Sequence, residues 1–399
     1  MVDAVDWIAR RVDTGHVASV ASIDLSRAFD SVDHGVLLMK LNWYGVDTRW
    51  FESYRAGRRE VVRGGSLSLP LSHGVPQGSL VGPILFSIFT NDLPSYLPHG
   101  RLVSYADDTQ LLDSAHPDHL SILMSRQEET LLAVKSYFTS NSLKMNPSKT
   151  TLLLVGTSHN LKKTSSFHVN FSGHTLTPSP FVKMLGVTID QTLSWEKHIS
   201  TVVKKCNSIL ACLYKIRHHL TPEARKLLIQ SLVFPHILYC LSVWGGAAAC
   251  HMDRVQKVVN FGARVVTGAR RRDHISPALS ALGWLRMGDL VTRRDSLGVF
   301  RALCDLRAPP AVRSLFTRRA AVSQRVTRAT VAGELEVPPF RLSLSCRTFS
   351  FRAASSWNRL PPAVTASRTR GEFVRRLSNA LDVPSTYIFF FYFLYVLNN

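Results

Sequence analysis

Three carboxylates at two places in this sequence have the type and spacing to hold metal ions together. Asp24 directly follows residues 17–23, a run rich in Val, Ala and Ser that predicts a strand. Asp107 and Asp108 lie between the apolar segments 102–105 and 109–112, where a tight hairpin would turn. If the strand and the hairpin are neighbours in one sheet, the three carboxylates converge. Like charges that close repel one another unless a cation lies between them.

Magnesium is the cation that this chemistry favours. Mg²⁺ takes hard oxygen ligands and keeps water and phosphate oxygens in its shell. Two such ions about 3.5–4 Å apart can hold the attacking and leaving oxygens of an in-line phosphoryl displacement. The carboxylates therefore predict polymerase-type phosphoryl transfer. An isolated Tyr-Ala-Asp-Asp is more often a solvated turn, so this prediction depends on what accompanies it.

A loop rich in glycine and proline lies between the two carboxylate segments. It runs from His73 to Pro83 and is followed by the apolar run 84–89, which predicts a buried helix. Within the loop Gln77 stands beside Gly78, and a small residue there lets a substrate approach the backbone closely.

Five ordered segments resemble the reverse transcriptase family, and most of all its non-LTR (LINE-type, jockey-like) retrotransposon branch. The resemblance covers roughly residues 10–250, and more loosely 325–380. It implies an α+β fold in which a right-hand polymerase palm, an antiparallel sheet with packed helices, is followed by a helical thumb and an Arg-rich, mainly helical C-terminal region. The five segments are SIDLSRAFD (22–30), GVPQGSLVGP (74–83), YADD (105–108), NSLKMNPSKT (141–150) and MLGV (184–187).

The resemblance implies an RNA-directed DNA polymerase, a nucleotidyltransferase that uses two Mg²⁺ ions, with Mn²⁺ as an alternative. Asp24, Asp107 and Asp108 would be the catalytic metal ligands, assisted by the backbone carbonyl of Leu25. The primer 3′-hydroxyl would attack the α-phosphate of a dNTP. Lys149 would donate a proton to the leaving pyrophosphate. The alternative for Lys149 is a solvated lysine after a proline turn.

The family also assigns binding roles around this centre. Phe29 would be the aromatic gate under the sugar, where its ring excludes a 2′-hydroxyl; the alternative is an ordinary core aromatic beside Ala28. Gln77 and Gly78 would line the nucleotide pocket. Tyr105 and Ala106 would contact the primer terminus, and Leu185 and Gly186 would contact the primer backbone. RNA template, DNA primer and dNTPs are the partners that follow.

The expected organisation has five parts: a palm with partial fingers (1–192), a thumb-like helical region (193–250), an Arg-rich helical region (251–337), a C-terminal element-type segment (338–383) and an unstructured apolar tail (384–399). Only 23 residues precede Asp24. We therefore expect a chain truncated before the fingers region, with no nuclease domain and no residues for the dNTP triphosphate.

Charge is concentrated in the C-terminal part of the chain. Residues 251–380 hold 24 basic residues against 8 acidic ones, which suits a polyanionic partner. The alternative is a solvated arginine surface. Arginines interleaved with Phe349, Phe351 and Trp357 suit either stacking on single-stranded RNA or the packing of a small helical cap. A non-catalytic RNA- or DNA-binding relic of a retrotransposon is therefore the second functional hypothesis.

Other features limit the class of protein. A hydrophobic content of 45% excludes a largely disordered chain. The apolar tail 387–397 is shorter than the roughly 20 residues of a membrane span. Six cysteines without a CxxC pair fit reduced thiols, so an intracellular protein of nucleus or cytoplasm without a membrane is expected. Local patterns predict helices at 2–12, 36–41 and 119–138 and starting at His198 and Thr221, and strands at 151–155 and 182–189.

Overall fold

The computed structural model describes residues 1–55, 57, 59–61, 68–70, 73–75, 78–322 and 333–381. Gln77 and the apolar tail lie outside these residues. Helix and antiparallel sheet are mixed, and the chain divides into two units. The sheet unit comprises Gly15–Gly186 and Asp190–Thr192, and the helical unit comprises Met1–Thr14, Val187–Ile189 and Leu193–Asn399.

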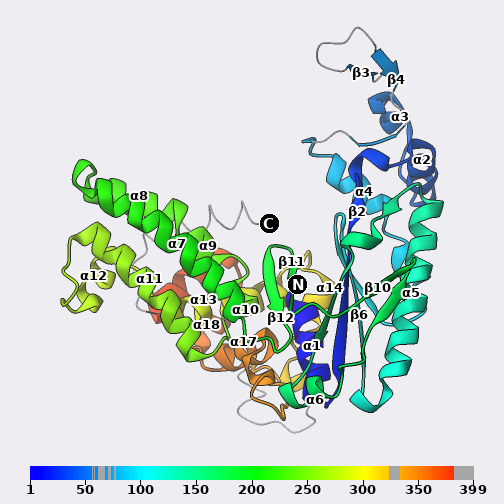
Figure 1. The fold of residues 1–399 in the computed structure, drawn as a ribbon. Helices are drawn as coiled ribbons and strands as arrows, with labels where there is room; N and C mark the ends of the chain where they lie inside the picture. The colour runs from blue at the N-terminus through cyan, green and yellow to red at the C-terminus, as the bar shows by residue number, and fades with distance from the viewer. Residues whose placement is uncertain are drawn as a thin grey trace. The chain divides into compact units, whose positions relative to one another are not determined.

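A four-stranded antiparallel sheet, in the order β5-β6-β1-β8, forms the centre of the sheet unit (Figure 1). Its strands are β1 (Val17–Ile23), β5 (Arg101–Tyr105), β6 (Asp108–Ala115) and β8 (Thr151–Val155). The predicted strands 17–23 and 151–155 are confirmed. Because β1 pairs with β6 on one side and with β8 on the other, six of its seven residues are buried. This explains its Val, Ala and Ser content, since all three side chains are small enough for a central strand.

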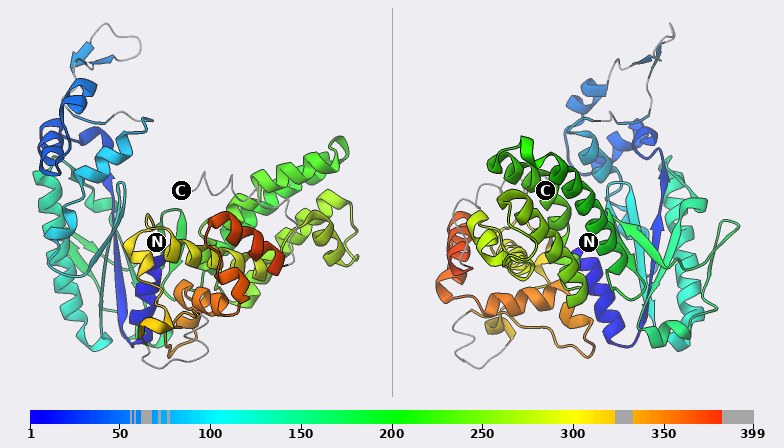
Figure 2. Two further views of the ribbon diagram at one scale, coloured as in Figure 1. Left: turned by 180° about the vertical axis from the view of Figure 1, so that it is seen from behind. Right: turned by 60° about the vertical axis from the view of Figure 1, so that its left-hand side comes forward.

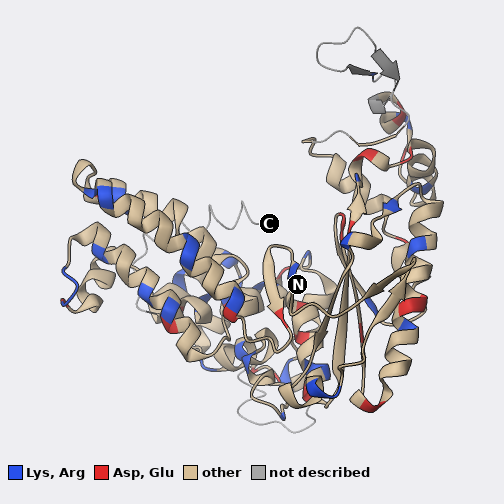
Figure 3. Cartoon of the chain, viewed as in Figure 1, with Lys and Arg blue, Asp and Glu red and all other residues tan. Residues whose placement is uncertain are grey.

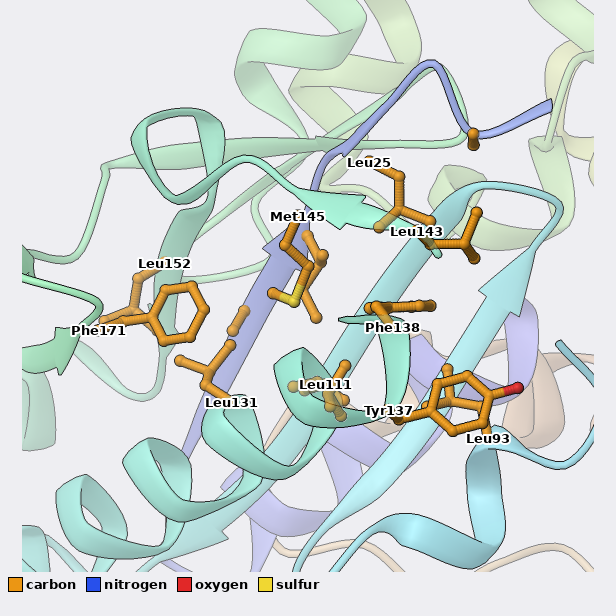
Figure 4. Close-up of a cluster of buried hydrophobic side chains, with 14 of the residues drawn as sticks. Leu25, Leu93, Leu111, Leu131, Tyr137, Phe138, Leu143, Met145, Leu152 and Phe171 are labelled. Carbon is orange, nitrogen blue, oxygen red and sulfur yellow. The ribbon is translucent and has the colours of Figure 1, made fainter. Parts of the chain in front are cut away.

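Helix α5 (Leu120–Ser140) runs along one face of this sheet and adds six buried side chains to its hydrophobic core (Figures 1 and 2). Leu131 and Phe138 of α5 pack among side chains from the strands, including Leu111 and Leu152 (Figure 4). The predicted helix at 119–138 is confirmed, with bounds that differ by one residue at the start and two at the end. Each Å² of apolar surface that these side chains bury stabilises the fold by about 25 cal/mol. The sheet and α5 therefore form the stable part of the unit, from which the loops project.

Shorter elements complete the sheet unit. Residues 182–189 do not form one strand, so that prediction is wrong: Leu185 and Gly186 have φ values of 46° and 81° and turn the chain. The helices are α2 (His34–Trp43), α3 (Arg49–Arg55), α4 (Gly82–Phe89) and α6 (Ser158–Lys162), with short 3₁₀ turns η1 (Phe29–Ser31), η2 (Leu93–Tyr96), η3 (Pro117–His119) and η4 (Pro147–Lys149). The remaining strands of this unit are β2 (Leu25–Ser26), β3 (Arg59–Val61), β4 (Ser68–Pro70), β7 (Lys144–Met145), β9 (Val169–Phe171), β10 (His174–Leu176) and β11 (Phe181–Met184). Of strand β12 (Val187–Asp190), only Asp190 belongs to the sheet unit.

The helical unit begins with the first helix of the chain, α1 (Val2–Asp13), which packs against its C-terminal part. The buried Asp6 carboxylate accepts hydrogen bonds from the backbone N–H groups of Phe349 (3.1 Å) and Ser350 (2.8 Å). It thereby satisfies the free N–H groups at the start of α17 (Phe349–Asn358). The Asp13 carboxylate likewise accepts a hydrogen bond from the backbone N–H of Leu342, at 2.7 Å. Five donor groups of residues 341–350 thus bond to the carboxylates of Asp6 and Asp13, and no local sequence pattern indicates these contacts.

The remaining elements of the helical unit follow in chain order. They are α7 (Glu196–Ile216), η5 (Arg217–His219), α8 (Pro222–Leu232), α9 (Phe234–Leu238), α10 (Leu241–Trp244), α11 (Ala249–Thr267), α12 (Ile275–Leu282), α13 (Met287–Cys304), α14 (Pro310–Arg313), α15 (Arg319–Val322), η6 (Ser345–Arg347), α18 (Pro362–Thr365) and α19 (Arg370–Ala380). Two predicted starts are confirmed: α7 buries His198 and five further side chains on one face, and the Thr221 hydroxyl accepts the N–H of Ala224 at the start of α8 (3.2 Å). Among the described residues, no helix combines the length and the apolar composition that a membrane crossing requires.

The aromatic residues of the C-terminal segment are mostly core residues. Phe349 and Trp357 are 3% and 2% exposed and pack in one cluster with Phe373. The half-buried Phe351 packs against Phe340, with ring centroids 5.0 Å apart. The interpretation as a helical cap is therefore confirmed, and stacking of single-stranded RNA on Phe349 and Trp357 is wrong, because neither ring is accessible.

A buried carboxylate should make the stability of the helical unit depend on pH. Asp295 of α13 is 0% exposed and pairs with Arg352 of α17 (3.1 Å). Burial raises the pKa of Asp295 from 3.8 to about 6, against the opposing charge of Arg352. Because the folded chain binds this proton more tightly than the unfolded chain, the resulting stability is complete below about pH 4 and is lost as the pH rises through 6.

We expect Asp295→Asn to remove this part of the pH dependence. Relative to the variant, the wild type should lose on the order of 3 kcal/mol of unfolding free energy between pH 3.5 and pH 7, measured by urea denaturation at each pH. The exposed Asp253→Asn is the control and should follow the wild-type curve. Parallel curves for wild type and Asp295→Asn would contradict the assignment.

Candidate active site

Asp107 and Asp108 lie at a sharp hairpin between β5 and β6. Tyr105 pairs with Asp108 across the strands, so the turn itself consists of Ala106 and Asp107. Ala106 has a φ of 53°, a left-handed value that a two-residue hairpin turn requires. The predicted hairpin is confirmed, with its turn one residue earlier than the Asp-Asp pair. Asp107 is therefore at the tip, and Asp108 is the first residue of β6.

The register of the sheet brings Asp24 to the same place. Ile23, the last residue of β1, pairs with Thr109 of β6, so the next pair in this antiparallel register sets Asp24 opposite Asp108. The electrostatics agree with this placement. Partial burial raises the pKa of Asp108, the negative charges of Asp107 and Asp24 raise it further, and Lys183 lowers it. Three carboxylates thus repel one another at one end of the sheet.

The fourth of the five segments lies beside the first. The backbone N–H of Asn146 donates to the carbonyl of Asp24 (2.9 Å), and β2 pairs with β7 so that Leu25 is opposite Met145. This pairing carries Lys149 to the carboxylates, where its Nζ lies 3.6 Å from Oδ2 of Asp24. The two side chains are 67% and 43% exposed, and an ion pair this exposed adds at most about 1 kcal/mol to stability. What Lys149 provides is positive charge beside the carboxylates.

The second segment is tied to the end of the first by the backbone. Val75 donates its N–H to the carbonyl of Phe29, and Gly74 donates to Val32, both at 2.8 Å. Gly74 has a φ of 91°, and a Cβ there would lie 3.1 Å from the carbonyl oxygen of Asp30. Only glycine fits this conformation and this approach, which accounts for the first glycine of the segment.

Phe29 is half-buried and packs against the hydrophobic core of the sheet unit. Its ring centroid is 4.8 Å from that of Phe86, which is fully buried in α4. Gly78 is exposed, with a φ of 78° and no atom within 4 Å of a Cβ position. Gln77 falls outside the described residues.

The residues predicted to contact the primer lie in two turns. Tyr105 is 69% exposed and stands directly before Ala106 in the β5–β6 turn. Leu185 is half-buried and Gly186 is exposed, in the turn between β11 and β12. The side chain of Leu25, in contrast, is buried, so only its backbone can serve a ligand.

Within the described part of the chain, no group of three or more His, Cys, Asp or Glu side chains is already arranged to hold a metal ion. The three carboxylates nevertheless have the donor atoms that a hard cation takes. A cation among them would also relieve the repulsion that raises the pKa of Asp108. The residues therefore fit Mg²⁺.

Lys183 is a residue that the motifs did not single out. It lies on β11, where Val182 and Met184 are buried and Phe181 and Lys183 are exposed, and its charge acts on Asp108. The signal in the sequence is this alternation just before Leu185 and Gly186, which sets Lys183 on the accessible face of its strand.

Comparison with known proteins agrees with this geometry. Residues 6–189 match the family model described as reverse transcriptase (RNA-dependent DNA polymerase). The chain is 30% identical over 283 residues to a probable RNA-directed DNA polymerase from transposon BS of Drosophila melanogaster, covering 65% of this chain and 30% of that protein. It is 26% identical over 283 residues to the RNA-directed DNA polymerase from mobile element jockey of the same species, covering 66% of this chain and 30% of that protein.

A telomerase structure from Candida albicans, in complex with a fragment of telomeric RNA, aligns with a TM-score of 0.32 and 12% identity, over 70% of this chain and 49% of that chain. That similarity is too low to carry an argument. The chain spans about 30% of the length of the two fly relatives. The resemblance indicated by the five motifs is confirmed: residues 6–189 match the reverse transcriptase family model, and the chain is similar to the RNA-directed DNA polymerases of Drosophila retrotransposons.

Proposed function

We propose that this chain is an RNA-directed DNA polymerase, which extends the 3′-hydroxyl of a DNA primer with dNTPs on an RNA template. The observation that carries this proposal is the pairing of Ile23 with Thr109, whose chain neighbours are Asp24 and Asp108, with Asp107 at the adjoining hairpin tip, inside the segment that matches the reverse transcriptase family. Polymerisation is a phosphoryl transfer, and it needs such a centre of oxygen ligands.

Asp24, Asp107 and Asp108, with the carbonyl of Leu25, would hold two Mg²⁺ ions, for which Mn²⁺ could substitute. When bound, these ions stabilise the negative charge that develops on the oxygens of the transferred phosphoryl group. The chain itself contributes the position of the carboxylates. The pairing of β1, β5 and β6 supports this part of the proposal, because it brings the ends of the strands that flank the three carboxylates to one edge of the sheet.

Side chains around the carboxylates would bind and orient the reactants. Lys149, whose Nζ lies 3.6 Å from Oδ2 of Asp24, would give a proton to the leaving pyrophosphate. Phe29 would exclude a ribose 2′-hydroxyl, with Gln77 and Gly78 lining the same nucleotide pocket. Tyr105 and Ala106 would contact the primer terminus, and Leu185 and Gly186 the primer backbone.

We further propose the layout of a right-hand polymerase. Residues 1–192 would form the palm with part of the fingers, 193–250 a thumb, 251–337 an Arg-rich helical region and 338–383 a C-terminal segment. The family match over 6–189 and the long helix α7 that follows it support this layout. Helix α1 is an exception, because it packs with the C-terminal helices.

Primer extension tests the proposal. The purified chain should add dNTPs to a labelled DNA primer annealed to RNA, only when Mg²⁺ or Mn²⁺ is present. A second candidate is a non-catalytic nucleic-acid-binding protein, which the arginine surplus of residues 251–380 favours. A chain that binds the primer–template but adds no nucleotide with either ion would favour that candidate and overturn the first.

A further inference from the structure

The helical unit contains a cavity of about 910 Å³ whose lining is strongly basic. The end of α7, the start of α8 and the end of α11 with its following loop enclose it. The lining contains no Asp or Glu. In Figure 3, Lys and Arg lie along these helices and in the loop after α11. The cationic residues that line the cavity are Arg217, Arg225, Lys257, Arg264, Arg270 and Arg271.

These charges are held in place without being neutralised. Arg225 donates to the carbonyl of Val265 (2.8 Å), and Arg264 donates to the carbonyls of Arg270 and Asp273 (both 3.1 Å). As far as the described residues go, none of the six cations forms an ion pair with a carboxylate. Elsewhere in the same unit, Arg352 and Arg319 do form such pairs. Six like charges around one hollow attract an anion with several charges.

Two neighbouring aromatic rings, tilted to each other, line the same cavity. The ring of Tyr214 is 46% exposed and lies 6.0 Å from the ring of Phe261, centroid to centroid. The Arg217 guanidinium lies over the Tyr214 ring, 3.8 Å from its centroid. A simple anion such as phosphate gains no stacking interaction from an aromatic ring. A flat, polarisable ring is instead the surface on which a nucleic-acid base stacks.

Gly268 shapes the basic side of the cavity. It directly follows the last residue of α11, with a φ of 76°, and starts the loop that carries Arg270 and Arg271. All three of these residues line the cavity together with Tyr214 and Phe261.

We propose that this cavity binds a single-stranded segment of nucleic acid. An unpaired base would extend the stack of Arg217 on Tyr214, and the neighbouring phosphates would contact Arg264, Arg270 and Arg271. A duplex offers its phosphates but keeps its bases stacked inside, so it cannot use the rings. The site uses none of the three carboxylates, and it goes beyond the proposed polymerase function.

Fluorescence anisotropy on the full chain, in EDTA to prevent turnover, tests the proposal with a labelled 12-nucleotide RNA, its DNA equivalent and the corresponding duplex. The Arg264→Gln/Arg271→Gln variant should bind the single strand at least about tenfold more weakly. Its slope of log Kd against log salt should fall by about 1.4, because each phosphate contact to a single strand contributes about 0.7. The control Arg313→Gln/Arg341→Gln removes the same charge from exposed residues outside the cavity and should keep the wild-type slope.

The stacking step has its own variants. Tyr214→Ala should weaken single-strand binding about tenfold, and Tyr214→Phe, which keeps the ring, should restore it. A 4-thiouridine-containing RNA should crosslink to the peptides that carry Tyr214 or Phe261. Equal affinity for duplex and single strand, or no effect of either the arginine or the tyrosine variant, would overturn the proposal.

The outcome is separable from that of the polymerase proposal. If the cavity variants weaken single-strand binding but the wild type extends no primer, only the polymerase proposal is refuted. If the chain extends primers and the cavity variants bind the single strand with the affinity of the wild type, only the proposal of a single-strand site is refuted.

Discussion

Replacing Asp107 and Asp108 together by Ala should abolish RNA-templated primer extension, with a fall in rate of at least about 10³-fold. Charge stabilisation by bound metal ions supplies several kcal/mol to a phosphoryl transfer, and each 1.36 kcal/mol is a factor of ten. Asp24→Asn should have a comparable effect, because it removes the carboxylate that the sheet register sets opposite Asp108. The measurement is single-turnover incorporation of one dNTP.

Stability separates this result from simple unfolding. Partial burial raises the pKa of Asp108, and the charges of Asp107 and Asp24 raise it further. The double variant removes this partly desolvated charge and the repulsion around it, so it should be at least as stable as the wild type in urea. The matched control is Asp118→Asn/Glu129→Gln, which removes two carboxylates whose side chains are 66% and 62% exposed. It should keep full activity. Incorporation that survives in Asp107→Ala/Asp108→Ala would refute the assignment of the site.

Shrinking Phe29 to Val should raise the ratio of rNTP to dNTP incorporation by up to about 10²-fold. This factor is about the discrimination that a pocket reaches when it rejects one added hydroxyl group by shape alone. The half-buried ring contacts Phe86 on one side, so its accessible side is available to a sugar. Asp24 and its backbone contacts stay in place, and the rate with dNTPs should change much less than the ratio.

Phe86→Leu provides the control for a packing effect. Phe86 is fully buried against Phe29, so this change should cost stability, about 1 kcal/mol or more, and leave the sugar ratio unchanged. A folded, active Phe29→Val enzyme with an unchanged ratio would show that Phe29 is an ordinary core residue. An equal rise of the ratio in Phe86→Leu would show that loosened packing, and not the gate, admits the ribose.

Much of the local structure of this protein follows from its sequence. Residues 17–23 and 151–155 are strands because small and branched side chains suit a buried central sheet, and Thr221 caps its helix because its hydroxyl meets a free N–H one turn later. Residue type and spacing predict the metal role of the three carboxylates, the resemblance to the reverse transcriptase family implies the roles of Phe29 and Lys149, and all of these roles stay predictions. Where local signals competed, the sequence reading failed: the apolar run 182–189 hid a turn at Leu185 and Gly186.

Only the tertiary structure decided what depends on residues far apart in the chain. Lys40 is buried because Asp92 and Tyr137, from distant elements, accept its hydrogen bonds at 2.8 and 3.1 Å. The junction of α1 with α17 and the effect of Lys183 on Asp108 are of the same kind. So is the cavity whose cations come from α7, α8, α11 and a loop. Periodicity and capping report on neighbours within one or two turns, whereas these features depend on which surfaces meet when helices and strands pack.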